Sequence, residues 1–540
     1  MKKRIEVVLF FLLCLLIISF PTAGQSVKEF PSEQDLFLPE LNKFMGSNLN
    51  ESQQAILTNF GSLWLSGTYD IEEKNKIISL SNLLLKRRAR ANPNFLEFLT
   101  SLSAFKLTEG NQENFTPWYN GLVELLNKKN FILRDIRRYL NITKGVMEAR
   151  VLYTSSSNEW KIRSGEYRFF FDSTLKIIFK KSDLVCYAQR DSGIIYETEG
   201  TLFPDRAVWI GEGGIVSWER AGFDRTQVYA ELQNYQIDLS HPYYSADSVL
   251  FYHNIYLDKP LKGSLEERIK ATPSPNMATF PQFDSYAKRI QIANMFENIH
   301  FEGGISMRGS KLNGTGEKHK NANLSIIKND TTLLNIKSEY IVFSKDRIAS
   351  KKAIATIYLE EDSIFHPGIA FNYQISNKEI SLYRTNDKLT HSPYFNSYHN
   401  LDMEFEMLSW KIDEPRIYLT MSRGASLGQA RFESISYFNE IEFIRIQGID
   451  EHHPLFTLKK FTKWYYSETF PVDDLAKWMN KPPYQIKQLC VRLSTDGFIY
   501  YDQNTGEITI KKRLYDFIDA FAGEIDFDVI DFVSNTRAPL

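Results

Sequence analysis

The sequence predicts a multidomain α+β protein that is mostly β: a helical bundle, then a long antiparallel β-repeat region, then a small unit of helices and a hairpin. The chain has 540 residues, several times the roughly 100–200 residues of one domain. Apolar residues recur at helical spacing up to about residue 150, and short strand-like runs follow. Phe, Tyr and Trp make up 14% of the chain, which favours strands because flat rings pack well on a pleated surface.

The composition is that of an ordinary globular protein. Hydrophobic residues make up 43% of the chain and charged residues 24%, with a formal net charge of -2. These values exclude wholesale disorder. They also exclude a strongly basic nucleic-acid binder, so we expect no nucleic-acid partner.

The N-terminus has the parts of a secretory signal peptide. Lys2, Lys3 and Arg4 precede an apolar run at residues 7–20, and small residues follow before Gln25. A membrane anchor is the alternative, but the run is shorter than the roughly 20 residues that cross a bilayer. We therefore predict that residues 1–24 are a cleaved signal peptide and that the exported chain has no transmembrane helix.

Only Cys186 and Cys490 remain after this cleavage, because Cys14 lies inside the apolar run. That position of Cys14 also argues against a lipoprotein anchor. A disulfide between the other two is the alternative, but secreted domains built on disulfides are dense in cysteine. We expect two buried thiols.

Residues 25–150 carry the helical pattern. One face presents Ile56, Phe60, Leu63 and Trp64, and Gly67 is placed to end that helix. Such a stripe must be buried against neighbours, so we expect a compact bundle of five or six helices. A peptide-binding groove of solenoid type is the alternative, although no fixed-period repeat is present.

Local signals predict where individual helices begin and end. Asp70, followed three residues later by Glu73, has the spacing of a capping box, and we expect its helix to run to Asn92-Pro93. Thr116-Pro117 predicts an N-cap with proline at the first helical position.

From residue 151 to about 460 the pattern consists of short strand-like runs, such as Leu175–Phe179 and Leu184–Tyr187. We expect linkers or surface loops at residues 259–283, which contain several prolines, and at Gly309–Asn323, which is polar. The first of these divides the region into β domain 1, residues 151–260, and β domain 2, residues 284–460. An elongated jelly-roll or solenoid and a compact sandwich both fit this pattern.

Asp-Ser pairs precede several of the apolar runs. Side-chain oxygens of both residue types bond nearby backbone amides, so the pairs suit corners between strands. They are Asp172-Ser173, Asp191-Ser192, Asp247-Ser248 and Asp362-Ser363.

Residues 461–520 show a different order of elements. Leu475 and Trp478 indicate a helix, Pro482-Pro483 starts a second helix that runs from Tyr484 to Thr495, and a hairpin across Asn504-Thr505-Gly506 follows. Helix, helix and two-stranded wing is the order of a winged-helix domain. The basic residues of this segment are offset by acidic ones, so we expect a scaffold for protein contact or for structural packing. Residues 521–540 alternate in polarity from Glu524 onward, which predicts the start of a further β segment or a tail.

No catalytic, cofactor-binding or metal-ligating residue is predicted. Gly211–Gly214 offers a glycine-rich loop, but a phosphate cradle leads into a helix and here a strand-like run follows, so we expect a β-turn. Glu212 and Glu219, close to Trp209 and Trp218, are a weak candidate for a carboxylate pair that acts on sugars.

The remaining candidates are histidines. His452-His453, His391 and His399 lack the i, i+4 helical spacing of a zinc protease and lack a cysteine partner, so we expect them in surface loops. Gly-x-Ser-x-Gly, Walker and His-Glu-x-x-His motifs do not occur. We therefore expect a non-catalytic protein without a cofactor.

The block Trp209–Gly222, together with Ala246–Val249, resembles a family of large uncharacterised exported proteins of Gram-negative bacteria. This resemblance covers most of the chain and implies a periplasmic or outer-membrane-associated location. The strand-like runs are also similar, more weakly, to the OstA-like β-jelly-rolls of lipopolysaccharide transport. The open apolar interior of those proteins carries acyl chains, but no motif transfers a binding site to this sequence.

Three functions remain open. The leading hypothesis is envelope assembly or lipid/lipopolysaccharide-type transport through an extended β surface or apolar groove. The helical and winged-helix-like units then dock onto other envelope proteins. The second hypothesis is a surface glycan-binding or polysaccharide-processing protein that stacks sugars on exposed Trp and Tyr. The third is a structural envelope scaffold without a small ligand.

Overall fold

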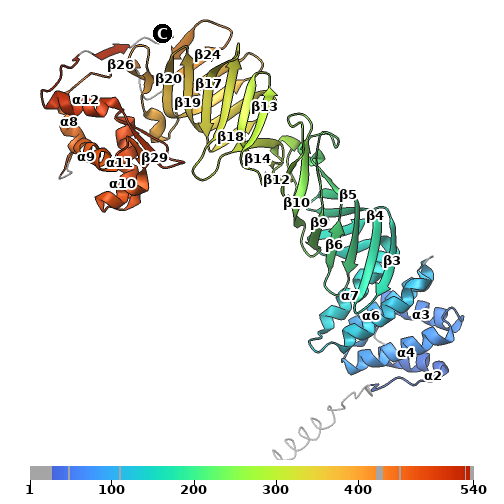
Figure 1. The fold of residues 1–540 in the computed structure, drawn as a ribbon. Helices are drawn as coiled ribbons and strands as arrows, with labels where there is room; N and C mark the ends of the chain where they lie inside the picture. Colours follow the sequence, from blue (N-terminus) through green and yellow to red (C-terminus); the bar gives the residue numbers. More distant parts are fainter. Residues whose placement is uncertain are drawn as a thin grey trace, which may run out of the picture. The chain divides into compact units, whose positions relative to one another are not determined.

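The computed structural model describes residues 27–46, 49–108, 111–420, 430–448, 452–529 and 531–534. The predicted signal peptide, residues 1–24, lies outside them. The described chain is a mixed α+β protein, mostly β, with 11 α-helices (α2–α12) and antiparallel strands (Figure 1). Its contacts divide it into two compact units, residues 1–214 with 234–244 and residues 215–233 with 245–540.

The first unit contains the helices of the N-terminal segment and seven strands in its described part. The helices are α2 (Gln34–Met45), α3 (Glu51–Leu65), α4 (Ile71–Lys86), α5 (Leu96–Leu107), α6 (Phe115–Asn127) and α7 (Leu133–Ala149). The strands are β1 (Val151–Thr154), β2 (Asn158–Ile162), β3 (Glu166–Phe171), β4 (Leu175–Ala188), β5 (Asp191–Phe203), β6 (Val208–Glu212) and β9 (Asn234–Asp238).

The capping box predicted at α4 is confirmed. Asp70 Oδ1 accepts a hydrogen bond from the Glu73 amide at 2.8 Å, and Glu73 Oε2 accepts one from the Asp70 amide at 3.0 Å. The predicted end of this helix is wrong, because α4 stops at Lys86, ahead of Pro93. Arg88 takes a φ of 60° and turns the chain so that Ala89 is buried. A proline sets only the outer limit of a helix, and here a left-handed residue ends it earlier.

The predicted N-cap at Thr116 is also wrong. α6 begins at Phe115, directly after a 3-10 turn, η2 (Gln112–Asn114). Asn114 does not cap the helix, because its Oδ1 accepts a hydrogen bond from the Phe169 amide in β3 at 3.0 Å. A contact with the sheet therefore overrides the local signal.

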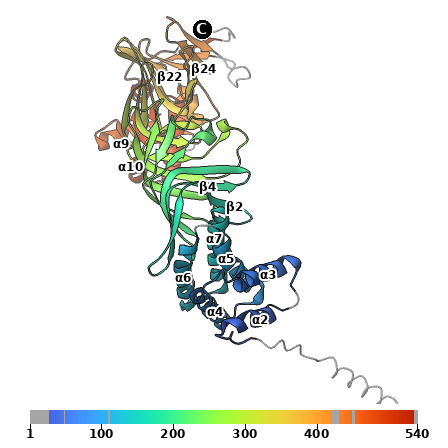
Figure 2. The ribbon, with the colours of Figure 1, turned by 90° about the vertical axis from the view of Figure 1, so that its right-hand side faces the viewer.

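The helices pack closely on the first strands (Figure 2). Gly121 in α6 leaves no room for a side chain: a Cβ there would lie 2.6 Å from Tyr139 Oη in α7 and 2.7 Å from Leu175 Cβ in β4. Tyr167 Oη in β3 donates to Asn111 Oδ1 at 2.9 Å. The N-terminal helices and the first strands of the β region therefore share one core.

Strand β4 joins two ladders. Its first half pairs with β3 and its second half, from Leu184, pairs with β2, while β5 follows β4 with register shifts between Phe179 and Leu184. Lys181 takes a φ of 40° at this bend. The expectation of two separate short strands is therefore wrong: Lys180-Lys181-Ser182 form a bulge inside one strand and not a turn.

The second unit holds the remaining strands of the β region. They are β7 (Ile215–Ser217), β8 (Val228–Glu231), most of β10 (Tyr243–His253), β11 (Leu261–Arg268), β12 (Gln282–Ser285), β13 (Ile290–Phe296), β14 (Ile299–Arg308), β15 (Lys311–Thr315), β16 (Ala322–Lys328), β17 (Thr331–Ser338), β18 (Tyr340–Phe343), β19 (Arg347–Leu359), β20 (Asp362–Gln374), β21 (Glu379–Tyr383), β22 (Tyr394–Asn396), β23 (Leu401–Glu404), β24 (Met407–Lys411), β25 (Ile417–Thr420), β26 (Ala430–Ser434) and β30 (Asp531–Ser534).

Three long strands of this unit repeat the behaviour of β4. The first half of β14 pairs with β16 and its second half with β15. β19 pairs with β18 near its start and with β17 near its end. β20 pairs first with β22 and then with β21. Each long strand therefore pairs along one edge with two different strands, and apolar side chains such as Ile336, Ile357 and Phe371 are fully buried.

Two expected loops are partly strand. Residues 259–283 contain β11 and the start of β12, and Gly309–Asn323 contains β15 and the start of β16. The prolines of the first segment and the polar residues 317–321 of the second lie outside these strands, as predicted. Lys311 is an exposed residue of β15, so its polarity alone did not mark a loop.

The Asp-Ser pairs behave as predicted at two corners. The amides of Ser173 and Ser192 donate to the Oδ1 atoms of Asp172 and Asp191, at 2.7 and 2.8 Å. At Asp247-Ser248 the prediction fails, because Ser248 lies inside β10 with a φ of 59°. The pair there accommodates an irregularity within a strand.

The β pattern ends earlier than residue 460. Asn439 caps α8 (Glu440–Gln447), where its Oδ1 accepts hydrogen bonds from the amides of Ile441 and Glu442 at 2.9 and 3.3 Å. His453 caps α9 (Pro454–Tyr465), with proline at the first helical position. Residues 440–447 and 454–460, which the sequence pattern had predicted to belong to the β region, are therefore helical.

Residues 440–521, which we call the C-terminal module, then continue with β27 (Thr469–Pro471), α10 (Val472–Met479), α11 (Pro483–Thr495), β28 (Ile499–Tyr501), β29 (Glu507–Ile510) and α12 (Lys512–Phe521). The two helices α10 and α11 and the β28–β29 hairpin were predicted, whereas β27 and α12 were not. One apolar core joins them, with Leu455, Leu475, Leu493, Phe498 and Leu514 fully buried. Beyond the module, the described residues include one short strand, β30, within the segment whose alternation from Glu524 onward predicted the start of a β segment or a tail.

Candidate functional site

The C-terminal module lies against one edge of the β region within the second unit. Three sets of polar contacts join their described residues: a buried cluster of charged side chains, the turn between β28 and β29, and the end of α11. Beside these contacts a groove opens between the module and the 3-10 turn η5 (Lys388–His391). This joint is the candidate functional site.

The buried charged cluster centres on Asp402 in β23. Lys511 Nζ donates to its two carboxylate oxygens at 2.8 and 3.0 Å, and Arg513 donates to Oδ2 at 2.9 Å. Arg513 also donates to Glu433 Oε2 at 3.1 Å, and Glu433 lies opposite Asp402 in the β23–β26 ladder. The two cations come from the start of α12, so this cluster ties the module to two strands.

The electrostatics of the cluster are those of charges removed from water. Burial lowers the pKa of Lys511, and Asp402 opposes this shift. Burial also acts to lower the pKa of Arg513, but Asp402 and Glu433 hold it above its usual value. Loss of Asp402 would leave Lys511 without a carboxylate partner and Arg513 with Glu433 alone.

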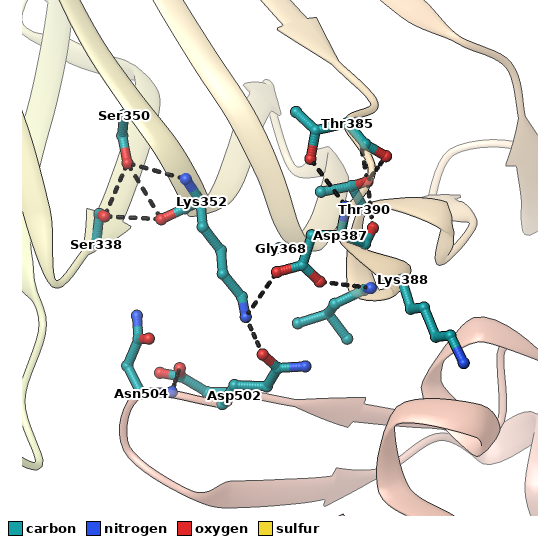
Figure 3. A network of polar contacts seen from close by, with 12 residues as sticks. Ser338, Ser350, Lys352, Gly368, Thr385, Asp387, Lys388, Thr390, Asp502 and Asn504 are labelled. Carbon is teal, nitrogen blue, oxygen red and sulfur yellow. Dashed lines mark hydrogen bonds and ion pairs between the residues drawn. The ribbon is translucent and has the colours of Figure 1, made fainter. Parts of the chain in front are cut away.

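The turn between β28 and β29 makes the second contact (Figure 3). Asn321 Nδ2 donates to Asp502 Oδ2 at 2.8 Å. Lys352 reaches from the β region to Gln503 and also lies 3.4 Å from Asp387 Oδ2. The sharp end of the hairpin is therefore fixed to the β strands.

Lys352 is presented by a bulge in β19. The register with β20 shifts between Ser350 and Ala353, and the Lys352 carbonyl accepts a hydrogen bond from Ser338 Oγ at 2.7 Å. Ser338 Oγ and Ser350 Oγ lie 2.8 Å apart beneath it (Figure 3). Side-chain hydroxyls thus satisfy the backbone that the bulge exposes.

The third contact closes one end of α11 against η5. Thr495 Oγ1 donates to the Lys388 carbonyl at 3.4 Å, and Ser392 Oγ lies 3.2 Å from Ser494 Oγ. α11 occupies the position of the second helix that the sequence predicted from Tyr484 to Thr495. The last turn of α11 is therefore anchored to the β region on one side, while Arg492 and Thr495 of the same turn line the groove.

The groove has a volume of about 1290 Å³. η5 forms one wall, with Lys388 and His391, and α11 with the residues just before it forms the other. Apolar side chains of α11 contribute to the lining, and Ile486 among them is buried. Four cationic residues line it: Lys388, Lys481, Lys487 and Arg492.

Sequence reasoning missed this groove, although its basic residues were noted. The charges of residues 461–520 balance when they are summed, but the fold separates them. Lys481, Lys487 and Arg492 line the groove, while Asp473 and Asp474 lie in the first turn of α10 outside the groove lining. A net charge summed over residues 461–520 hides this separation. The charge on each face of α11, counted separately, would have indicated the groove.

The histidine candidates do not come together. His453 is buried and caps α9, with its Nε2 2.9 Å from the Phe443 carbonyl, so the expectation of a surface loop is wrong for it. His391 lines the groove, and its Nε2 lies 3.1 Å from the Thr385 carbonyl oxygen. His399 and His452 are exposed. Within the part of the chain that the structure describes, no group of His, Cys, Asp and Glu is arranged to hold a metal ion.

The other candidates are structural. Gly213 and Gly214 both have positive φ and are followed by β7, as a turn requires. Trp209 and Trp218 are fully buried, so neither indole offers a sugar a stacking surface beside Glu212 or Glu219.

Cys186 and Cys490 are buried thiols, as predicted. Burial raises the pKa of Cys490 to about 12, which makes it unreactive at neutral pH.

The chain matches no protein-family model, no curated protein and no solved structure. Among the described helices, none combines the length and the apolar character that crossing a bilayer needs.

Proposed function

We propose that this chain is an exported, non-catalytic protein of a bacterial cell envelope that acts in envelope assembly by binding other envelope proteins. The β region provides an extended surface, and the N-terminal helices and the winged-helix-like C-terminal module serve as docking units. The leader-like N-terminus supports the export, and the architecture of the strands supports the mode of action.

The observation that carries this proposal is the double pairing of the long strands. β4, β14, β19 and β20 each pair along one edge with two successive strands. Strands shared in this way suit jelly-roll-like units with broad surfaces. This supports a protein whose sheet surfaces bind its partners.

The packing inside the β region favours its surface over an interior groove. An acyl-chain carrier needs inward apolar positions that remain unfilled. Here inward side chains such as Ile336, Ile357, Ile369 and Phe371 are fully buried against one another. The interior thus has the character of a packed core.

The contacts of α11 favour protein docking over DNA binding by the module. A winged-helix protein reads DNA by placing its recognition helix in the major groove. The end of α11 is instead hydrogen-bonded to the β region through Thr495 and Ser494. A helix held in this way is better suited to form one wall of a protein-binding groove.

The experiment is to express the whole chain in a Gram-negative host, fractionate the cells and determine the N-terminal residue and the bound lipids by mass spectrometry. The proposal predicts protein in the periplasmic or membrane fraction, with Gln25 first and no stoichiometric lipid. Cytosolic protein with Met1 intact contradicts the export.

Lipid or lipopolysaccharide-type transport is the second candidate, and the double pairing of bent strands favours it, because the OstA-like jelly-rolls that the strands resemble are carriers. Stoichiometric acyl lipid in the same experiment establishes transport in place of assembly.

Glycan binding is favoured by one observation, the exposure of Trp464 and Tyr466 at 58% and 93%. Saccharide screening of the purified protein and of Trp464→Ala tests it. Binding that the substitution removes supports this function against the first.

A further inference from the structure

We propose that the groove between η5 and α11 binds an acidic segment of a partner protein, in which carboxylates alternate with aliphatic side chains. This inference rests on the proposed docking function and names the chemistry of the partner. It follows from the charge of the groove, from its lining and from its shape.

The cations of the groove come from both walls. Lys388 projects from η5, and Lys481 and Lys487 come from the start of α11 and the turn before it. These three side chains are exposed and form no ion pair with the described residues. Their charge is therefore available to a ligand.

The carboxylates that line the groove are already engaged. Asp387 Oδ2 lies 3.4 Å from Lys352 Nζ, and Asp387 Oδ1 accepts a hydrogen bond from the Leu389 amide at 3.0 Å. Asp496 pairs with Arg445 at 3.6 Å. The groove therefore presents a positive potential, which complements an anionic partner.

The apolar part of the lining selects among anionic partners. Ile486, Leu489 and Val491 are aliphatic, and they accept aliphatic side chains between the carboxylates of a peptide. Tyr501, the one Phe, Tyr or Trp side chain of the lining, is only 1% exposed and offers no face on which a base or a sugar ring could stack.

The shape of the groove also disfavours a nucleic-acid duplex. A recognition helix enters a major groove about 12 Å wide with both of its flanks free. η5 covers one flank of α11, and Ser392 and Ser494 hold the two together. An extended peptide needs only the space between these walls.

The test uses the whole protein as purified from the envelope fraction and a fluorescein-labelled peptide of twelve residues that alternates Glu with Leu, Val and Ile. Fluorescence anisotropy measures its dissociation constant. We expect Lys388→Glu and Lys487→Glu, one in each wall, each to weaken binding by about tenfold or more, because each replaces an attraction by a repulsion.

The matched control is a charge reversal on a different helix of the same module. Lys460→Glu and Lys463→Glu on α9 change exposed lysines outside the groove, and we expect them to alter the dissociation constant by less than about twofold. All four variants should retain the thermal melting temperature of the unmodified protein, since each substituted side chain is exposed.

Three results overturn the inference: no binding of the acidic peptide to the unmodified protein, equal weakening by the α9 variants, or tighter binding of single-stranded DNA that Lys487→Glu removes. Each leaves the proposed function standing if the protein is in the envelope fraction with Gln25 first. Cytosolic protein with Met1 intact removes the proposed function whatever the peptide does.

Discussion

Lys511 Nζ donates to both carboxylate oxygens of Asp402, at 2.8 and 3.0 Å, and the side chains are 6% and 2% exposed. The pair joins the start of α12 to β23, so it holds the C-terminal module on the β region. A buried ion pair adds little net stability when compared with apolar packing, but breaking it by removing one partner is costly.

Asp402→Ala should therefore destabilise the second unit strongly. The substitution leaves Lys511 and Arg513 buried without their shared carboxylate, at a cost of about 3–5 kcal/mol. Urea denaturation followed by tryptophan fluorescence measures the change. The control is Asp413→Ala, whose partners Lys328 and Lys378 lie 3.6 Å away from a side chain that is 65% exposed. We expect the control to cost less than about 1 kcal/mol, and equal losses in both variants would refute the role of the cluster.

Gly211 is required for packing against Tyr235, and substitution tests this. A Cβ at Gly211 would lie 2.1 Å from Tyr235 Cζ, so Gly211→Ala should destabilise the first unit by about 1–3 kcal/mol. Gly61→Ala is the control in the same unit. It lies within α3, and the nearest atoms to its new Cβ are 3.7 Å away, so it should stabilise the protein by about 0.5–1 kcal/mol. Thermal unfolding distinguishes the two, and a stabilising Gly211→Ala would contradict the packing.

His253 should make stability depend on pH. Burial lowers the pKa of His253 to about 4, and neither ring nitrogen forms a hydrogen bond with another described residue. An unfolded histidine titrates near pH 6.5, so between roughly pH 6.5 and 4 the unfolded chain binds a proton that the folded chain does not. The free energy of unfolding should fall as the pH is lowered through this window, by at most about 1.4 kcal/mol for each pH unit.

His253→Phe tests this dependence. The ring lies among Phe223, Phe251 and Tyr256, so an apolar ring suits the site and removes the proton linkage. We expect unchanged or higher stability at pH 7 and a smaller loss between pH 6.5 and 4, measured by urea titrations at each pH. The exposed His399→Phe should keep the original slope. A slope that His253→Phe leaves unaltered would show that other groups cause it.

The parts of the fold that the sequence predicted are those that local interactions determine. The capping box of Asp70 and Glu73 involves residues three apart, and the hairpin across residues 504–506 depends on a glycine with a φ of 75°. Such signals lie within one short window, so periodicity and turn chemistry reveal them.

The parts that were missed depend on partners distant in sequence. β4 continues through Lys181 because β2 and β3 pair with its two halves, and Asn114 is taken from its helix by Phe169. The groove combines Lys388 with Lys487, which only the folded chain brings together. A single sequence shows which residues the chain has, but not which of them the fold brings close together.

The central claim is that the C-terminal module and the β region of the second unit form one body, with the groove between fixed walls. Nitroxide labels at Lys388→Cys and Lys487→Cys test it by electron–electron double resonance, since Cys186 and Cys490 are buried. We predict one narrow distance distribution that broadens when Asp402→Ala is added. A broad distance distribution in the protein with Asp402 intact would show that the two walls of the groove move relative to each other.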